Sequence, residues 1–150
     1  MISLPHGRGL VLAAGVVWIG VLALAGDPVP VLTWNSLRGL NSKTGDMSAF
    51  IKQSNKHVVR IAGFMVPLED EDDNVTEFLL VPWAGACIHT PPPPPNQIVD
   101  VNTGRGKKVK VEFEAPFWVQ GRLEVVTVKS PYGDVSYKMS DTVVTPYEEK

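Results

Sequence analysis

The sequence contains only one cysteine, Cys87, and only three histidines in 150 residues. A single cysteine cannot form a disulfide within the chain, which excludes the disulfide-stabilised class of small secreted domains. Charge of one sign is not in excess either: the formal net charge is −2. Such a balance does not favour nucleic acid or an anionic membrane as a partner. The lone thiol must therefore be buried, reactive, bound to metal or paired with another chain.

Long hydrophobic runs are also absent, because the longest one, Leu10–Leu24, is short for a membrane span. It follows the weakly basic start at His6 and Arg8 and precedes the small-residue pattern at Ala23–Ala25. This layout is typical of a signal peptide. We therefore predict that residues 1–25 direct export to the periplasm or beyond. The alternative is an uncleaved N-terminal segment that anchors the protein to the membrane.

The remaining chain has the length of one compact domain. Residues 26–56 are predicted to form an extended and helical prefix, with a short helix near Thr33–Leu37 capped by Asn35 or Ser36 and a second over Asp46–Gln53 capped by Asp46 or Ser48. Residues 57–147 are predicted to be β, and residues 148–150 form a polar tail.

Short runs of β-branched and apolar residues define the β region. Glycines inside the two longest runs, Gly63 and Gly121, favour bulges and a strongly bent sheet. The expected fold class is therefore all-β, a small OB-like barrel with a short helical N-terminal prefix. The predicted strands cover Val58–Leu68, Glu77–Trp83, Gly85–Thr90, Ile98–Val101, Pro116–Val128, Val135–Met139 and Val143–Pro146.

The stretch Phe78–Val101 carries the residues best suited to chemistry. If Gly85–Thr90 is a strand, Cys87 and His89 project from the same face, about 7 Å apart. A thiolate and an imidazole are suitable zinc ligands, and a carboxylate from the acidic loop that begins at Glu69, or His57, would complete the site. The alternatives are a buried, inert cysteine beside a hydrogen-bonded histidine and a thiolate nucleophile activated by imidazole.

Five consecutive prolines follow His89 and predict a stiff polyproline II segment without amide donors. It would either dock into an aromatic-lined groove of a partner or serve as a strut packed on the barrel. Asn96 and Gln97 end the segment, where they would bond free backbone carbonyls or orient His89. The prolines are Pro91, Pro92, Pro93, Pro94 and Pro95.

Three segments resemble the bacterial secreted proteins of domain-of-unknown-function family 3299 (DUF3299). They are GFMVPLE (Gly63–Glu69), EFLLVPWAGACIHTPPPPPNQIV (Glu77–Val99) and FWVQGRL (Phe117–Leu123), and they follow an LTW segment at Leu32–Trp34. The most specific element is a GACIHxPPPPPNQ-type motif. Two positions depart conservatively from the pattern: Trp83 and Thr90 stand where an aromatic residue and valine are common.

The resemblance implies more about the cellular setting of such proteins than about the reaction or ligand of any of them. Similar proteins are encoded beside envelope ABC-type exporters and histidine-rich periplasmic proteins that handle zinc or manganese. It implies that Cys87 and His89 match the metal site of the family, with Glu69 as the next ligand. Since this chain has no histidine-rich tract, a single-site accessory protein fits it better than a bulk metal buffer.

The sequence thus favours, over an enzyme, an exported accessory protein of an envelope transport system that binds zinc or another transition metal. Its expected partner is an ABC-type transporter or a periplasmic metal-handling protein. A homodimer sharing the metal across a two-fold axis is a further expectation. The alternative is a metal-free periplasmic interaction module that docks through Pro91–Pro95.

Overall fold

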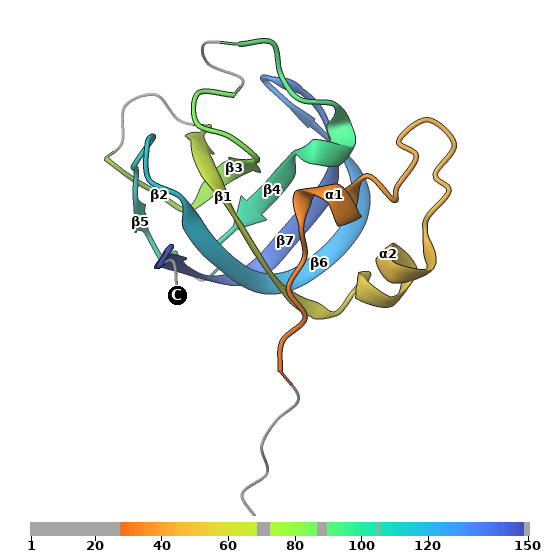
Figure 1. Cartoon of the computed structure of the whole chain (residues 1–150). Helices are drawn as coiled ribbons and strands as arrows, with labels where there is room; N and C mark the ends of the chain where they lie inside the picture. Colours follow the sequence, from red (N-terminus) through yellow and green to blue (C-terminus); the bar gives the residue numbers. More distant parts are fainter. Residues whose placement is uncertain (1–27, 69–72, 87–89, 105, 149–150) are drawn as a thin grey trace, which may run out of the picture.

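The computed structural model describes residues 28–68, 73–86, 90–104 and 106–148. Figure 1 shows a β-barrel with short helices packed beside it. The elements in chain order are α1 (Trp34–Leu37), α2 (Ala49–Ser54), β1 (Val58–Pro67), β2 (Asn74–Val75), β3 (Glu77–Val81), the 3₁₀ turn η1 (Pro95–Gln97), β4 (Val99–Asn102), β5 (Val109–Lys110), β6 (Phe117–Ser130) and β7 (Gly133–Pro146).

Five strands close into a barrel in the order β1-β3-β4-β7-β6, and β6 pairs back with β1. All of these pairs are antiparallel except β4 with β7, which run parallel. Five strands wound in this way form an OB-type barrel, with the last strand inserted beside the third. The predicted fold class is therefore confirmed.

The two predicted glycine positions have different roles. The prediction of a bulge at Gly121 was right in place and wrong in strand. Gln120 pairs with Val143 and Arg122 with Ser140, so the extra residue belongs to β7, where Asp141 and Thr142 stand opposite Gly121. Gly63 instead marks the residue at which β1 changes its partner from β6 to β3. A Cβ there would lie 2.7 Å from the Trp34 ring and 2.8 Å from the Val81 carbonyl oxygen, so the crossing of three segments requires glycine.

The helical prefix begins with a capping box. Thr33 is the N-cap of α1: its hydroxyl accepts from the Ser36 amide at 3.1 Å, and the Ser36 hydroxyl accepts from the Thr33 amide at 3.0 Å. The prediction of Asn35 or Ser36 as the cap was wrong, since the helix starts earlier and Ser36 takes the reciprocal position of the box. Ser48 caps α2, as predicted.

The prefix packs into the barrel. Leu32, Leu37 and Ile51 are at most 2% exposed and belong to the same interior cluster as the strand residues. The buried Tyr137 hydroxyl of β7 donates to the Leu37 carbonyl at 2.7 Å, and the Trp34 indole N–H donates to the Ala62 carbonyl at 2.7 Å. Residues of the prefix and of the barrel therefore share one hydrophobic core.

The predicted strand Gly85–Thr90 was wrong at both of its described ends. Gly85 has a φ of +74° and Ala86 forms an isolated bridge with Thr90. Two residues four positions apart in one extended strand cannot bridge to each other, so the prediction fails at Ala86 and Thr90. The face-sharing argument for Cys87 and His89 consequently loses its basis, although these two residues themselves lie outside the described ranges.

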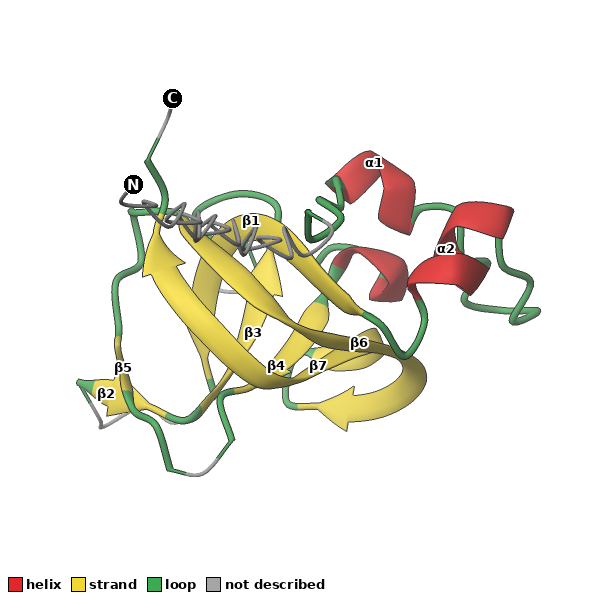
Figure 2. Ribbon diagram, turned by 90° about the horizontal axis from the view of Figure 1, so that it is seen from below, coloured by secondary structure: helices red, strands yellow, loops and turns green. Residues whose placement is uncertain are grey.

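Two smaller differences concern strands. The predicted strands at Val135–Met139 and Val143–Pro146 are one continuous strand, β7, which passes through Asp141 at a φ of +52°. The short β2–β5 pair was not predicted, because two residues per strand leave no pattern to read. Figure 2 shows this pair at one side of the barrel and the helices at the opposite side. Over the described ranges, no helix has the length and apolar character needed to cross a membrane.

Candidate functional site

The three predicted metal ligands, Cys87, His89 and Glu69, lie outside the described residues. Their assignment as ligands therefore remains a prediction, and the structure bears on it through their neighbours. Among the described residues, no group of three or more histidine, cysteine, aspartate or glutamate side chains is placed to hold a metal ion. His57 is exposed, with its Nδ1 3.0 Å from the Asn55 carbonyl oxygen.

The neighbours of Glu69 and Cys87 meet in one small cluster on the outer surface of the barrel wall. Leu68, which precedes Glu69, packs against this cluster, and Ala86, which precedes Cys87, is fully buried within it. We call this group the outer cluster. Its buried members are Val66, Leu79, Val81, Ala86, Ile98 and Val135, with Phe64, Leu68, Val128 and Tyr132 packed against them.

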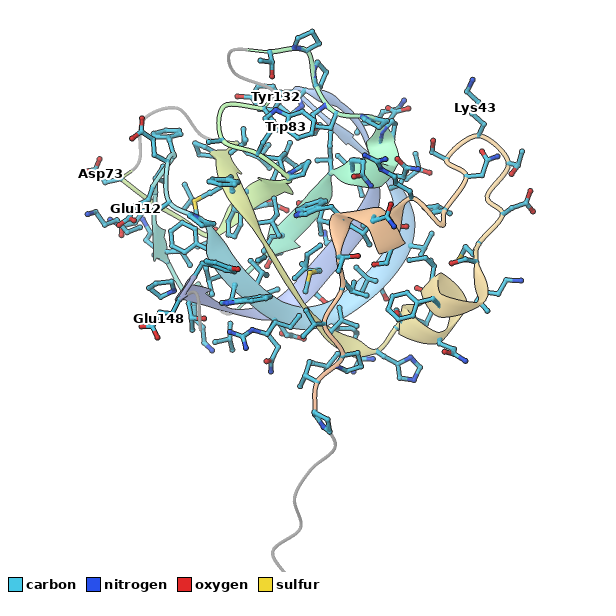
Figure 3. The ribbon with its side chains drawn as sticks, viewed as in Figure 1. Lys43, Asp73, Trp83, Glu112, Tyr132 and Glu148 are labelled. Carbon is cyan, nitrogen blue, oxygen red and sulfur yellow. The ribbon has the colours of Figure 1, made fainter. Side chains whose placement is uncertain are left out.

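The other end of the motif returns to the same place. Thr90 bridges to Ala86, and the chain re-enters the outer cluster at Ile98, which is 1% exposed. Both ends of the Cys87–His89 segment and the start of the Glu69 loop are thus attached to one end of the barrel. Figure 3 labels Trp83 and Tyr132 toward this end of the molecule.

The proline segment is shorter than predicted. Pro94 has polyproline II angles, with φ −62° and ψ 155°, but Pro95 begins the 3₁₀ turn η1. The prediction of a five-proline rod was therefore wrong at its last residue. The burial is uneven: Pro93 is buried, whereas Pro91, Pro92 and Pro94 are exposed. One proline holds the segment to the protein and the others face solvent.

Asn96 and Gln97 bond backbone carbonyls, one of the two roles considered for them. The acceptors are in the helical prefix: the Asn96 side-chain amide donates to the Leu40 carbonyl at 2.8 Å, and the Gln97 amide donates to the Trp34 carbonyl at 2.9 Å. Gln97 is 3% exposed. These bonds fix the end of the motif to the prefix. Any role toward His89 remains a prediction.

A buried carboxylate three residues after Gln97 in the sequence was not predicted. Asp100 of β4 is 3% exposed, its Oδ2 lies 3.7 Å from Lys138 Nζ on β7, and its buried Oδ1 accepts no hydrogen bond from the described residues. Burial raises the pKa of the Asp100 carboxyl, Lys138 opposes this rise, and Glu77 adds to it. The sequence signal that could have revealed this burial is the single charged residue between two valines in the run IVDV.

A surface hollow of about 630 Å³ lies between the prefix and the end of the motif. Its lining mixes both charges with polar groups, including Arg38, Asn41, Lys43, Asp46 and Asn96. Asn96 is the residue that the hollow shares with the motif, and its lining includes no histidine and no member of the outer cluster.

Comparison with known proteins places this architecture in a family. The sequence pattern of the family described as "Protein of unknown function (DUF3299)" matches residues 38–146. The chain is also similar to a DUF3299 family protein from Pseudomonas aeruginosa PAO1, known from a crystal structure, at 38% sequence identity and a TM-score of 0.59. That similarity covers 82% of this chain and 87% of the other. No curated protein gives a significant match.

Proposed function

We propose that this chain, which belongs to the DUF3299 family, is an exported metal-binding accessory protein of an envelope transport system. The proposed metal is zinc, held by the Cys87 thiolate, the His89 imidazole and the Glu69 carboxylate. The description of the family assigns no activity, so the proposal rests on the chain's own residues.

The observation that carries the proposal is the shared outer cluster. Leu68 and Ala86 are covalently adjacent to Glu69 and Cys87, and both pack in that cluster. This shared packing of Leu68 and Ala86 supports a site that draws one ligand from each of the two segments that follow them. The bridge from Ala86 to Thr90 returns the chain to this area directly after His89.

A ligand set of this kind suits a carrier. Zinc in structural sites is closed by four protein ligands, whereas three ligands leave one position for water or for a group from a partner. A free fourth position lets a transport protein take over the metal by ligand exchange. Binding requires the thiol to lose its proton, so zinc affinity should fall in acid.

The test is zinc stoichiometry and affinity on the full-length chain, purified reduced in detergent. We expect about one equivalent of zinc, with affinity lost in Cys87→Ser and His89→Ala and reduced in Glu69→Gln. His57→Ala is the matched control, since this exposed imidazole lies 3.0 Å from the Asn55 carbonyl oxygen of its own turn. It should bind as the parent does if Glu69, rather than His57, completes the site. Absence of zinc binding, or equal binding by the Cys87 and His89 variants, would contradict the proposal.

A metal-free interaction module is the second candidate, and one observation favours it. Pro91, Pro92 and Pro94 are exposed, and Trp83 nearby in the sequence is 44% exposed, which gives a partner groove both proline rings and an aromatic ring to contact. Under this alternative the Cys87 thiol is inert. Slow labelling of Cys87 that zinc does not change would favour the module, and labelling that zinc blocks would favour the metal site.

A further inference from the structure

The exposed apolar side chains are gathered mainly on one face of the barrel wall. The described residues include seven large hydrophobic side chains that are well exposed, and four of them, Val31, Val58, Val143 and Tyr147, lie on the outer surface formed by β1, β6, β7 and the segment before α1. Their exposed fractions are 54%, 47%, 53% and 38%. We call this surface the valine face.

Strand pairing places these side chains side by side. Val31 bridges to Arg60, Arg60 pairs with Gln120, and Gln120 pairs with Val143. Residues opposite one another in paired strands point to the same side of a sheet, so this row crosses the face from one edge to the other. Val58 lies in the next row, opposite Arg122. Scattered apolar residues are ordinary on a surface, and Arg60 and Gln120 stand between Val31 and Val143 in this row. The valines therefore need the neighbouring aromatic and cationic side chains to define an interaction surface.

An aromatic and cationic stack borders the valines. The guanidinium of Arg60 lies 4.2 Å from the centroid of the Trp118 ring, and the Trp118 and Tyr147 rings are 5.2 Å apart. Tryptophan and tyrosine prefer the boundary between lipid tails and water because one end of the ring system is apolar and the other polar. Arginine beside them can bond lipid phosphates in a bidentate manner.

The chain leaves the barrel from this same face. Val31 is part of the face, and only six residues lie between it and Leu24, the end of the apolar run at Leu10–Leu24. The seven Cα–Cα steps from Leu24 to Val31 span at most about 25 Å. An apolar run held in a bilayer would therefore keep the valine face within about 25 Å of the membrane surface.

We propose that the valine face rests on the surface of a lipid bilayer, with the valines and the Trp118–Tyr147 pair in the interfacial layer and Arg60 and Arg122 among the phosphates. A second copy of the chain is the other occupant to be tested. In a two-fold dimer each face meets itself, which would bring Arg60 and Arg122 toward the same face of the other copy, where Glu124 lies two residues beyond Arg122 on the same side of β6. The proposal is independent of zinc binding, so either can fail alone.

The experiment uses the full-length chain in phosphatidylcholine vesicles, with a nitroxide label at one position and Cys87→Ser as the background. One protein carries Val143→Cys on the valine face. The control carries Lys43→Cys, which Figure 3 places on the loop far from Glu148 at the other end of the molecule. Accessibility to oxygen, which concentrates in lipid, is compared with accessibility to a water-soluble nickel chelate.

The label at position 143 should show an oxygen-to-nickel accessibility ratio several-fold above that of the label at position 43. Adding Val58→Asp should lower the ratio at position 143 and leave that at position 43 unchanged, with the circular dichroism spectrum preserved. Equal ratios at the two positions would overturn the proposal. Spin–spin broadening at position 143, with low accessibility to both reagents, would also overturn it, by showing that a second copy covers the face.

Discussion

The barrel wall is packed on both of its surfaces, but the two clusters differ in size and origin. The interior cluster holds 17 buried residues taken from almost the whole described chain, from Leu32 to Met139. The outer cluster holds six, and it carries the residues that flank the predicted metal ligands. The interior cluster therefore sets global stability, whereas the motif is attached to a small accessory cluster that can loosen without unfolding the barrel.

Two adjacent residues of β3 test this comparison directly. Phe78 belongs to the interior cluster and Leu79 to the outer one, and both are 0% exposed. Phe78→Ala should lower the free energy of unfolding by about 3–5 kcal/mol, since it leaves a large cavity in the shared core. Urea unfolding followed by far-UV circular dichroism measures this loss.

Leu79→Ala should cost less, about 2–3 kcal/mol, because the outer cluster has fewer members that lose contact. It should also speed hydrogen exchange in the segment Pro82–Ala86 while β6 and β7 keep their protection. Val58→Ala, an exposed control on β1, should stay within about 0.5 kcal/mol of the parent. A separate outer cluster would be contradicted if Phe78→Ala and Leu79→Ala lowered the free energy of unfolding equally and if Leu79→Ala speeded hydrogen exchange equally throughout the barrel.

A smaller effect concerns the joint between the prefix and the barrel. Tyr137→Phe removes the hydroxyl that bonds the Leu37 carbonyl and leaves that carbonyl with only the longer bond from the Leu40 amide, at 3.3 Å. We therefore expect a loss of about 1 kcal/mol in urea unfolding. The control is Tyr132→Phe, because the Tyr132 ring is only partly buried against the outer cluster. A Tyr137→Phe protein as stable as the control would show that this hydrogen bond does not hold the prefix in place.

The barrel was predictable because its signals are local and repeated. Val58–Pro67 and Phe117–Ser130 alternate buried and exposed residues over much of their length, and this alternation is visible in the sequence. Gly121 indicated where the register is irregular, because the strand pattern continues on both sides of it, but it did not indicate that the extra residue belongs to β7. A short run such as Gly85–Thr90 has no such redundancy. Its small and apolar residues suit a strand, but its path depends on pairing between Ala86 and Thr90, which no local pattern reveals.

The candidate site was predictable only in part. The pairing of the motif with the prefix, through Asn96 and Leu40, links residues 56 positions apart, and sequence patterns do not encode such distances. Residue types identified Cys87, His89 and Glu69 as ligands, and these remain predictions. The burial of Asp100 was missed because a charged residue is normally assigned to solvent; its depth depends on what covers β4, which only the tertiary structure shows.

The smallest predicted effect on the free energy of unfolding concerns Asp100, which lies in the barrel wall between the interior cluster and the outer cluster. Its carboxyl is buried with one oxygen unpartnered, Lys138 Nζ is 3.7 Å from the other, and burial raises its pKa above the ordinary 3.8. Because the folded-state pKa is the higher one, the folded protein binds this proton more readily than the unfolded chain. The Asp100 carboxyl therefore favours folding in acid, and this advantage is lost as the pH rises through the folded-state pKa.

Asp100→Asn should remove this dependence. We expect the variant to be more stable than the parent by about 1 kcal/mol at neutral pH, because a buried charge with an unpaired oxygen is gone. The difference should shrink as the pH falls toward 3.8, where the parent carboxyl is itself neutral. Asp134→Asn is the control, since Asp134 is exposed and pairs with Lys129 at the surface. The measurement is urea unfolding of the variant and the parent at a series of pH values. If the difference in their free energy of unfolding does not change with pH, or if the variant is the less stable protein at neutral pH, then Lys138 stabilises the Asp100 charge by more than burial destabilises it.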